Sequence, residues 1–234
     1  MGLFLIAFLF SAASADVVQT ERQTEKVEVL IGHVFIKKEG YSENDNAQFV
    51  VDGYLPNSCY HLDETRVDRD PAHPFLFSVH QYALRSIGQS CRLGIIPYSL
   101  PETLGKLAHG DYQMNFNIGS NPPLSATFEV GTSRSDVTYP DVTSVTVANT
   151  SATLSGMLPS LCSRIQKIQV HLEDDVIVVS PLLTSSPGPC PQIIHPFQAS
   201  ISLGNLEEGR YLIQVGSAHG DLMKTFSVLR GDPE

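Results

Sequence analysis

Four cysteines have the widest choice of chemistry in this chain, because a cysteine can be a nucleophile, a metal ligand or half of a disulfide. No C-x-x-C pair and no histidine at ligand spacing accompanies them, which argues against a zinc site. A motif of the form G-x-L-P-x-x-C ends at Cys59 and recurs 103 positions later at Cys162. Since a duplicated module should carry its own bridge, we predict the disulfides Cys59–Cys91 and Cys162–Cys190.

Motifs for other catalytic groups do not occur in the sequence. A serine nucleophile is typically found in G-x-S-x-G or S-x-x-K, and a zinc peptidase carries H-E-x-x-H, yet none of these is present among the eight histidines and many serines. The interpretation is that the histidines are surface or capping residues. We therefore predict no enzymatic activity, no bound metal and no cofactor.

Two acidic clusters have the composition of calcium sites, since carboxylate oxygens are the ligands that calcium prefers. The first lies in residues 63–70 and also contains Arg66 and Arg69, and the second is Glu173-Asp174-Asp175. Neither follows the EF-hand spacing. We expect the arginines to neutralise the first cluster and the second to be a turn between strands, with calcium as the alternative.

The N-terminus has the features of an export signal. Residues 3–10 are continuously apolar, and Ala13-Ser14-Ala15 matches a small-residue cleavage site, so residues 1–15 are predicted to be a signal peptide. Disulfides persist in oxidising compartments, which favours a secreted or periplasmic protein. The formal net charge of -10 argues against nucleic-acid and anionic membrane surfaces. No later segment is long and apolar enough to be a transmembrane span.

Apolar and polar residues alternate over short runs bounded by Gly, Pro, Asn and Ser, a pattern typical of half-buried β-strands. Phe49, Val51, Gly53 and Leu55 share one face of such a run, as do Tyr112, Met114, Phe116 and Ile118 of another. The repeat predicts the following organisation: a polar extension over residues 16–26, one module over residues 27–131, a linker over residues 132–137 and a second module over residues 138–230.

One motif carries a family resemblance. L-x-x-L-x-x-G-x-Y ends at Tyr112 and again at Tyr211, each time just before an alternating run. It resembles the tyrosine corner of immunoglobulin-like and fibronectin type III-like sandwiches, in tandem as in bacterial exported proteins. The resemblance implies an all-β chain of two tandem Ig-like antiparallel β-sandwich domains, in which both tyrosines are structural. Met114 and Ile213 stand where immunoglobulin domains carry a cysteine, and the chain has no Trp.

Loops at the ends of a rigid sandwich are where such folds carry recognition. The leading hypothesis is a non-catalytic exported protein that acts as a binding or envelope-associated structural module for a protein or glycan partner. The candidate contact loop contains Pro187, Gly188, Pro189 and Pro191, which a disulfide at Cys190 would stiffen. A peptidase inhibitor presenting this loop is the alternative. A third possibility is a hydrolase with a cleft between the domains, lined by histidines and carboxylates.

Overall fold

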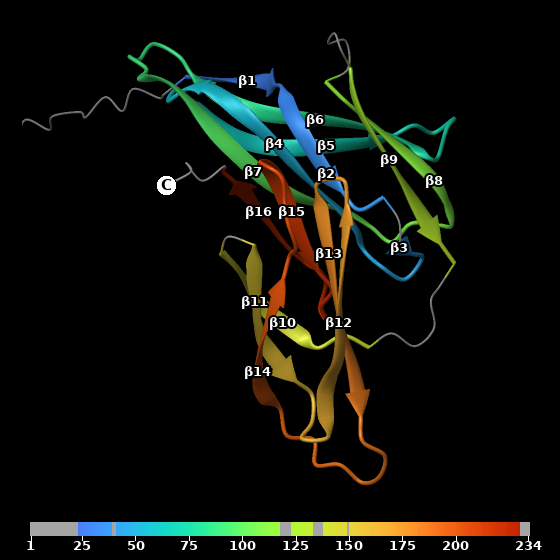
Figure 1. Ribbon diagram of the computed structural model, residues 1–234. Helices are drawn as coiled ribbons and strands as arrows, with labels where there is room; N and C mark the ends of the chain where they lie inside the picture. The colour runs from blue at the N-terminus through green and yellow to red at the C-terminus, as the bar shows by residue number, and fades with distance from the viewer. Residues whose placement is uncertain (1–22, 39–40, 118–122, 133–137, 149, 230–234) are drawn as a thin grey trace, which may run out of the picture.

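The computed structural model describes residues 23–38, 41–117, 123–132, 138–148 and 150–229, and it contains no helix in these ranges. The strands form two modules, one above the other in the view of Figure 1. The strands of module 1 are β1 (Thr24–Val29), β2 (Ile31–Ile36), β3 (Tyr41–Ser42), β4 (Ala47–Asn57), β5 (Tyr60–Arg69), β6 (Leu76–Ser86), β7 (Leu93–Gly105), β8 (Gly110–Phe116) and β9 (Leu124–Gly131). Those of module 2 are β10 (Asp141–Ala148), β11 (Ser151–Leu158), β12 (Ser163–Glu173), β13 (Val176–Ser185), β14 (His195–Ser202), β15 (Gly209–Val215) and β16 (Leu222–Val228).

Module 1 is a sandwich of two sheets. One has the order β1-β6-β8-β9-β3 with β5 also paired to β6, and the other has the order β2-β4-β7. The core lies between them, where Phe49 and Val51 of β4 and Met114 and Phe116 of β8 are fully buried. These residues belong to the faces predicted from the alternation. Ile118 lies outside the described residues.

Module 2 repeats this plan with a sheet β10-β11-β14 and a sheet β12-β13-β15-β16. Leu154, Ile177, Ile213 and Val215 form the centre of its core. The predicted all-β fold of two tandem sandwiches is therefore confirmed. Most strand pairs are antiparallel, but β3 with β9, β6 with β8 and β13 with β15 pair in parallel. The last two pairs are parallel because β7 and β14 each cross to the other sheet, so the chain returns to its first sheet in the original direction.

The corner tyrosines join the two sheets of each module. The Tyr112 hydroxyl donates to the carbonyl oxygen of Ala108 at 2.8 Å, and the Tyr211 hydroxyl donates to that of Glu207 at 3.2 Å. Both bonds run back to the loop that connects the sheets, as a tyrosine corner requires. The Tyr112 ring also stacks on Phe128 at a centroid distance of 5.2 Å.

The ends of the modules can be compared with the expected boundaries. Residues 1–22, which include the predicted signal peptide and most of the extension, lie outside the described residues, as do residues 133–137 of the linker. β1 begins at Thr24 and pairs with β6, so the last three residues of the predicted extension belong to the first sandwich. At the start of module 2, Thr138 is the first residue of the predicted range, and its carbonyl oxygen accepts a hydrogen bond from the Leu183 N–H at 3.0 Å.

A third apolar cluster lies between the modules. Phe35 of β2 and Val50 of β4 pack against Val176 of β13 and Leu212 of β15, and all four are buried. The outer face of the β2-β4-β7 sheet thus packs on the outer face of the sheet that contains β13, β15 and β16 (Figure 1). Sheet-on-sheet contact of this kind gives the junction a small core of its own.

Each sheet face of this contact has an equivalent face in the other copy of the repeat. Both of these equivalent faces are polar. Leu212 corresponds to Gln113 of module 1, which is exposed on β8. Val50 corresponds to Thr153 of module 2, which lies beside the exposed Thr146 and Ser200. The copies therefore differ where they touch, because only the faces that are covered carry apolar residues.

Candidate functional site

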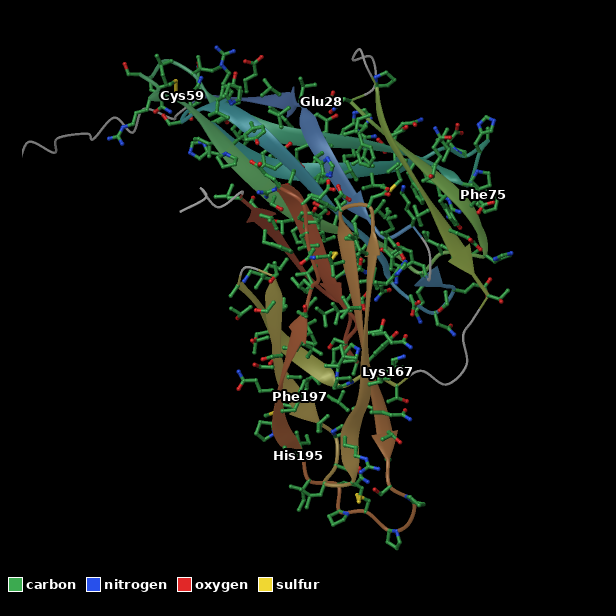
Figure 2. The ribbon with its side chains drawn as sticks, in the orientation of Figure 1. Glu28, Cys59, Phe75, Lys167, His195 and Phe197 are labelled. Atoms are coloured by element: carbon green, nitrogen blue, oxygen red, sulfur yellow. A yellow bond between two sulfur atoms is a disulfide. The ribbon has the colours of Figure 1, made fainter. Side chains whose placement is uncertain are left out.

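Each module is closed at one end by its disulfide. Cys59 bonds to Cys91 with a Cα–Cα distance of 5.4 Å, and Cys162 bonds to Cys190 with a distance of 6.0 Å. The predicted pairing is confirmed. In each case the bridge joins the turn between two strands to the segment that leads into the next sheet. We name residues 57–60 and 87–96 the module 1 cystine end, and residues 159–163 and 186–194 the module 2 cystine end. Cys59 and His195, close to the two ends, lie far apart in Figure 2.

Exposed aliphatic side chains gather at both cystine ends. In the described ranges, half of the exposed large hydrophobic residues lie there: Ile87, Leu93, Ile95, Ile96, Leu161, Ile193 and Ile194. Leu93 is 95% exposed, Ile95 72% and Ile194 65%. Apolar surface of this kind, when it is concentrated, marks interaction sites more often than single exposed residues do.

The predicted contact loop belongs to the module 2 cystine end. Pro187, Gly188, Pro189 and Pro191 are all exposed between β13 and β14. No Asp, Glu, Lys or Arg occurs in the sequence from Val176 to Leu206, although the chain as a whole has a net charge of -10. Charged residues are depleted from the centres of protein interfaces, so this composition favours a contact surface.

The two acidic clusters have partners in the protein. Glu173 is the last residue of β12, and Asp174 and Asp175 form the predicted turn to β13, with Asp174 at a φ of 54°. This turn also contacts module 1, because the Lys38 N–H donates to Glu173 Oε2 at 3.0 Å, the Lys38 ammonium pairs with Asp174, and His33 pairs with Asp175. Each of these pairs joins a residue of module 1 to a residue of module 2, so it forms only when the two modules are docked.

In the first cluster the expected arginine pairing is only partly present. Arg66 pairs with Asp68 at 2.8 Å, but Arg69 donates to the carbonyl oxygen of Pro74. Asp63 and Glu64 are instead paired with Lys26 of β1, a residue assigned to the extension by sequence. The reason is that β1 lies in the same sheet as β5 and brings its lysine to that surface. Within the described residues no group of three or more His, Cys, Asp or Glu is arranged to hold a metal.

A pocket of about 180 Å³ lies at the junction of the modules. Its walls come from β2, β4 and β7 of module 1 and from Arg210 of β15 in module 2. Asp52 contributes a carboxylate, His33 an imidazole and Tyr54 an exposed ring, while Gly32 and Gly53 contribute backbone. The Tyr98 ring packs directly against Gly53, since a Cβ at this position would lie 2.4 Å from that ring, and Tyr98 is only 7% exposed.

Asp52 and Arg210 dominate the electrostatics of this pocket. The Asp52 side chain is only 8% exposed, and its Oδ2 accepts a hydrogen bond from Nε of Arg210. Its Oδ1 is buried and has no hydrogen-bond partner among the described residues. Burial, with the Asp52 charge nearby, raises the pKa of Tyr98 to about 12. The pocket therefore contains an ion pair whose carboxylate keeps one buried oxygen without a hydrogen-bond partner.

A second polar group is buried on the same interface. Gln214 Nε2 donates to Asp221 Oδ2 at 2.6 Å, and the ammonium of Lys37 lies 4.2 Å from the centroid of the Tyr41 ring. Burial raises the pKa of Asp221, although the Lys37 charge acts in the opposite direction. Burial likewise raises the pKa of the Tyr41 hydroxyl. The junction thus combines an apolar cluster with ionisable groups from both modules.

The pocket has groups for binding rather than for nucleophilic attack. A cleft between the domains with histidine and carboxylate in its walls is present, as the hydrolase alternative requires. However, no Ser, Thr or Cys lines it among the described residues, and His33 and Asp52 each pair with another residue, Asp175 and Arg210. Triad chemistry needs a nucleophile within hydrogen-bond reach of a base.

Comparison with known families now places these modules. One family model, the ORF11 beta-sandwich domain, matches residues 49–130 and again residues 152–228, which together are more than half of the chain. The chain belongs to the ORF11 beta-sandwich domain family. No curated protein and no solved structure matches it.

The two ORF11 beta-sandwich segments run from β4 to β9 and from β11 to β16, and each contains the cystine and the corner tyrosine of its module. The match supports the tandem arrangement inferred from the resemblance. Gly32 and His33 lie before the first ORF11 segment, so the pocket combines family and non-family residues. None of the described elements is a helix that could span a bilayer.

The sequence predicted the cystine ends and offered a cleft between the domains lined by histidines and carboxylates, but not the residues that form this pocket. Asp52 and Arg210 lie in different copies, 158 positions apart, and no local pattern connects them. A usable signal was the apolar character of both faces of β13 and β15, where Val176, Val178 and Leu212 alternate with the core residues. A strand with two apolar faces is covered on both sides, which indicates a neighbour beyond the sandwich.

Proposed function

We propose that this protein is a non-catalytic, exported binding module that contacts a protein partner in the envelope or extracellular space through its cystine ends. The observation that carries the proposal is the concentration of exposed aliphatic side chains beside the two disulfides. A loop held by a disulfide loses less conformational entropy on binding than a free loop, which favours these ends as contact surfaces.

Export to a secreted or periplasmic location is part of this proposal. Two disulfides fit an oxidising compartment, and the apolar segment at residues 3–10 with its cleavage site fits a signal peptide. Expression of the full chain fused to a reporter, followed by N-terminal sequencing of the exported product, tests it. The expected first residue is Asp16.

Affinity capture from an extract of the source tests the binding surface. The oxidised protein is compared with the double variants Leu93→Ser/Ile95→Ser and Ile193→Ser/Ile194→Ser, each of which removes two exposed aliphatic side chains. The matched control is Val170→Ser/Leu172→Ser, which removes two exposed aliphatic side chains from β12, away from the disulfides.

The expected result is that at least one cystine-end variant loses a specifically captured protein, while the β12 control retains it. Capture that survives both cystine-end variants and fails with the control would contradict the proposal. Truncating a buried interface anchor commonly costs about 2 kcal/mol or more, so the loss should be about 30-fold in affinity.

A peptidase inhibitor is the second candidate, and the exposure of the loop at residues 187–191 favours it. The loop has the accessibility that an active-site cleft requires, and Cys190 holds it to β12's N-terminal turn. Titration of a panel of serine, cysteine and metallo-peptidases tests this function. Inhibition that disappears in Gly188→Asp would support it, and a panel without any inhibition would reject it.

A further inference from the structure

We propose that the pocket between the modules binds one pyranose residue of a neutral glycan. This ligand site is separate from the cystine ends and would give the protein a second kind of partner. The inference rests on the unsatisfied carboxylate oxygen of Asp52, the ion pair that it forms with Arg210 and the exposed ring of Tyr54 at the rim.

Asp52 and Arg210 both have hydrogen-bonding groups without a partner at this pocket. Asp52 is buried, and its Oδ1 has no partner among the described residues, whereas its Oδ2 accepts from Arg210. A buried acceptor without a partner is costly, so the site favours a ligand that donates a hydrogen bond. The guanidinium has five N–H donors in all, and the bonds to Asp52 and Thr225 account for two. Donors of Arg210 therefore remain beside the unpaired oxygen of Asp52.

Asp52 and Arg210 neutralise each other, and His33 pairs with Asp175 outside the pocket wall. A cationic ligand would be attracted by Asp52 and repelled by Arg210, and an anionic ligand would meet the opposite arrangement. A hydroxyl group both donates and accepts, so two neighbouring hydroxyls of a sugar can bond to Asp52 and to Arg210 at once. The ion pair thus fits a neutral polyol.

The pocket has one accessible aromatic ring. Tyr54 is 62% exposed at the rim, whereas Tyr98, which also lines the pocket, is only 7% exposed. Aromatic rings offer a flat apolar surface with a polar tip, which suits the C–H face of a pyranose. The volume of about 180 Å³ is below the range of roughly 300–1,000 Å³ that drug-sized ligands need, and it fits a single sugar ring.

Gly32 provides a sharp test, because the fold leaves space at this position. A Cβ there would meet nothing closer than the Asp52 carbonyl oxygen at 3.7 Å. Gly32→Val therefore adds side-chain atoms at the pocket without a clash at its Cβ. Tyr54→Ala removes the rim aromatic, which is exposed and contributes little to the core. The matched control is Met157→Ala, because Met157 is the exposed counterpart of Tyr54 in the repeat.

The experiment uses the oxidised, full exported chain in two stages. A glycan array of neutral oligosaccharides, including glucose-, galactose-, mannose- and N-acetylglucosamine-terminated chains, is followed by saturation-transfer NMR with the monosaccharide that signals. The expected result is binding that falls at least tenfold in Gly32→Val and in Tyr54→Ala and is unchanged in Met157→Ala. Circular dichroism confirms that each variant is folded.

Three results would overturn the inference: no signal from any neutral saccharide, a signal that persists in Gly32→Val, or a preference for charged saccharides. Protein capture through the cystine ends does not depend on this pocket, so Gly32→Val should capture the same protein as the wild type. Loss of glycan binding with intact capture, or the reverse, therefore separates the failure of this site from the failure of the proposed function.

Discussion

Replacement of Arg210 by Gln should destabilise the protein by leaving a buried carboxylate without its counterion. Asp52 is almost completely buried, and its second oxygen already has no hydrogen-bond partner in the described structure. Removing one member of a fully buried pair costs about 3–5 kcal/mol, whereas an exposed pair contributes roughly 0–1 kcal/mol. Because the Arg210 side chain is 42% exposed, we expect an intermediate loss of about 2 kcal/mol.

The assay is guanidinium or thermal unfolding of the oxidised protein at neutral pH. For a chain of this length, 1 kcal/mol corresponds to roughly 2–4 °C, so Arg210→Gln should lower Tm by about 4–8 °C. Arg66→Gln is the matched control, because its pair with Asp68 is exposed on both sides. We expect this control to lose no more than about 1 kcal/mol.

A second substitution separates the stranded charge from the lost packing. If the carboxylate is the cause, Asp52→Asn combined with Arg210→Gln should be more stable than Arg210→Gln alone, by about 1 kcal/mol, since a neutral amide is easier to bury. A double variant no more stable than Arg210→Gln, or an Arg210→Gln variant that behaves like Arg66→Gln, would refute the reasoning.

Three further outcomes are expected. Tyr112→Phe and Tyr211→Phe should each lower the free energy of unfolding by about 1–3 kcal/mol through the lost corner bond, measured by urea denaturation; equal stability to wild type would contradict the corner. Gly156→Ala should be severely destabilising or unfolded in circular dichroism, because its Cβ would lie 2.1 Å from the Asp141 carbonyl oxygen. Burial raises the pKa of Asp221 above 3.8, so its contribution to stability is fully present below pH 3.8 and is lost as the pH rises through the folded pKa. Asp221→Asn should therefore raise Tm at pH 7 but not at pH 3, and a gain independent of pH would contradict this sign.

The fold of each module was predictable because its determinants repeat within one copy. The disulfide pairing follows from the shared spacing of Cys59 and Cys162, and the strands follow from alternation along β4 and β8. Both features depend on residues that are near one another in sequence or lie at equivalent positions. Such local and repeated information is what a single sequence carries best.

The junction was not predictable in the same way. Asp174 was recognised as part of a turn, yet its pairing with Lys38 depends on how the two modules dock. The parallel pairing of β6 with β8 also escaped the alternation, since periodicity reports burial and not strand direction. The inter-module contact of Leu212 is the clearest one that was not predicted. Leu212 is an apolar residue on the outer face of a sandwich strand, a position that is normally polar unless another element covers it.

The unlike faces at the junction determine which sheet faces of the two modules can dock on each other. Module 1 offers one kind of sheet face and module 2 the other, so the contact is heterologous and does not close on itself. Repeated without change, it would add a third copy and then a fibre. Gln113 on the corresponding face of module 1 and Thr146 on that of module 2 make both faces polar, which disfavours this contact there, as the polar faces of capping units do in repeat proteins. Leucine at both positions would give the chain complementary ends, and the expected product is a filament.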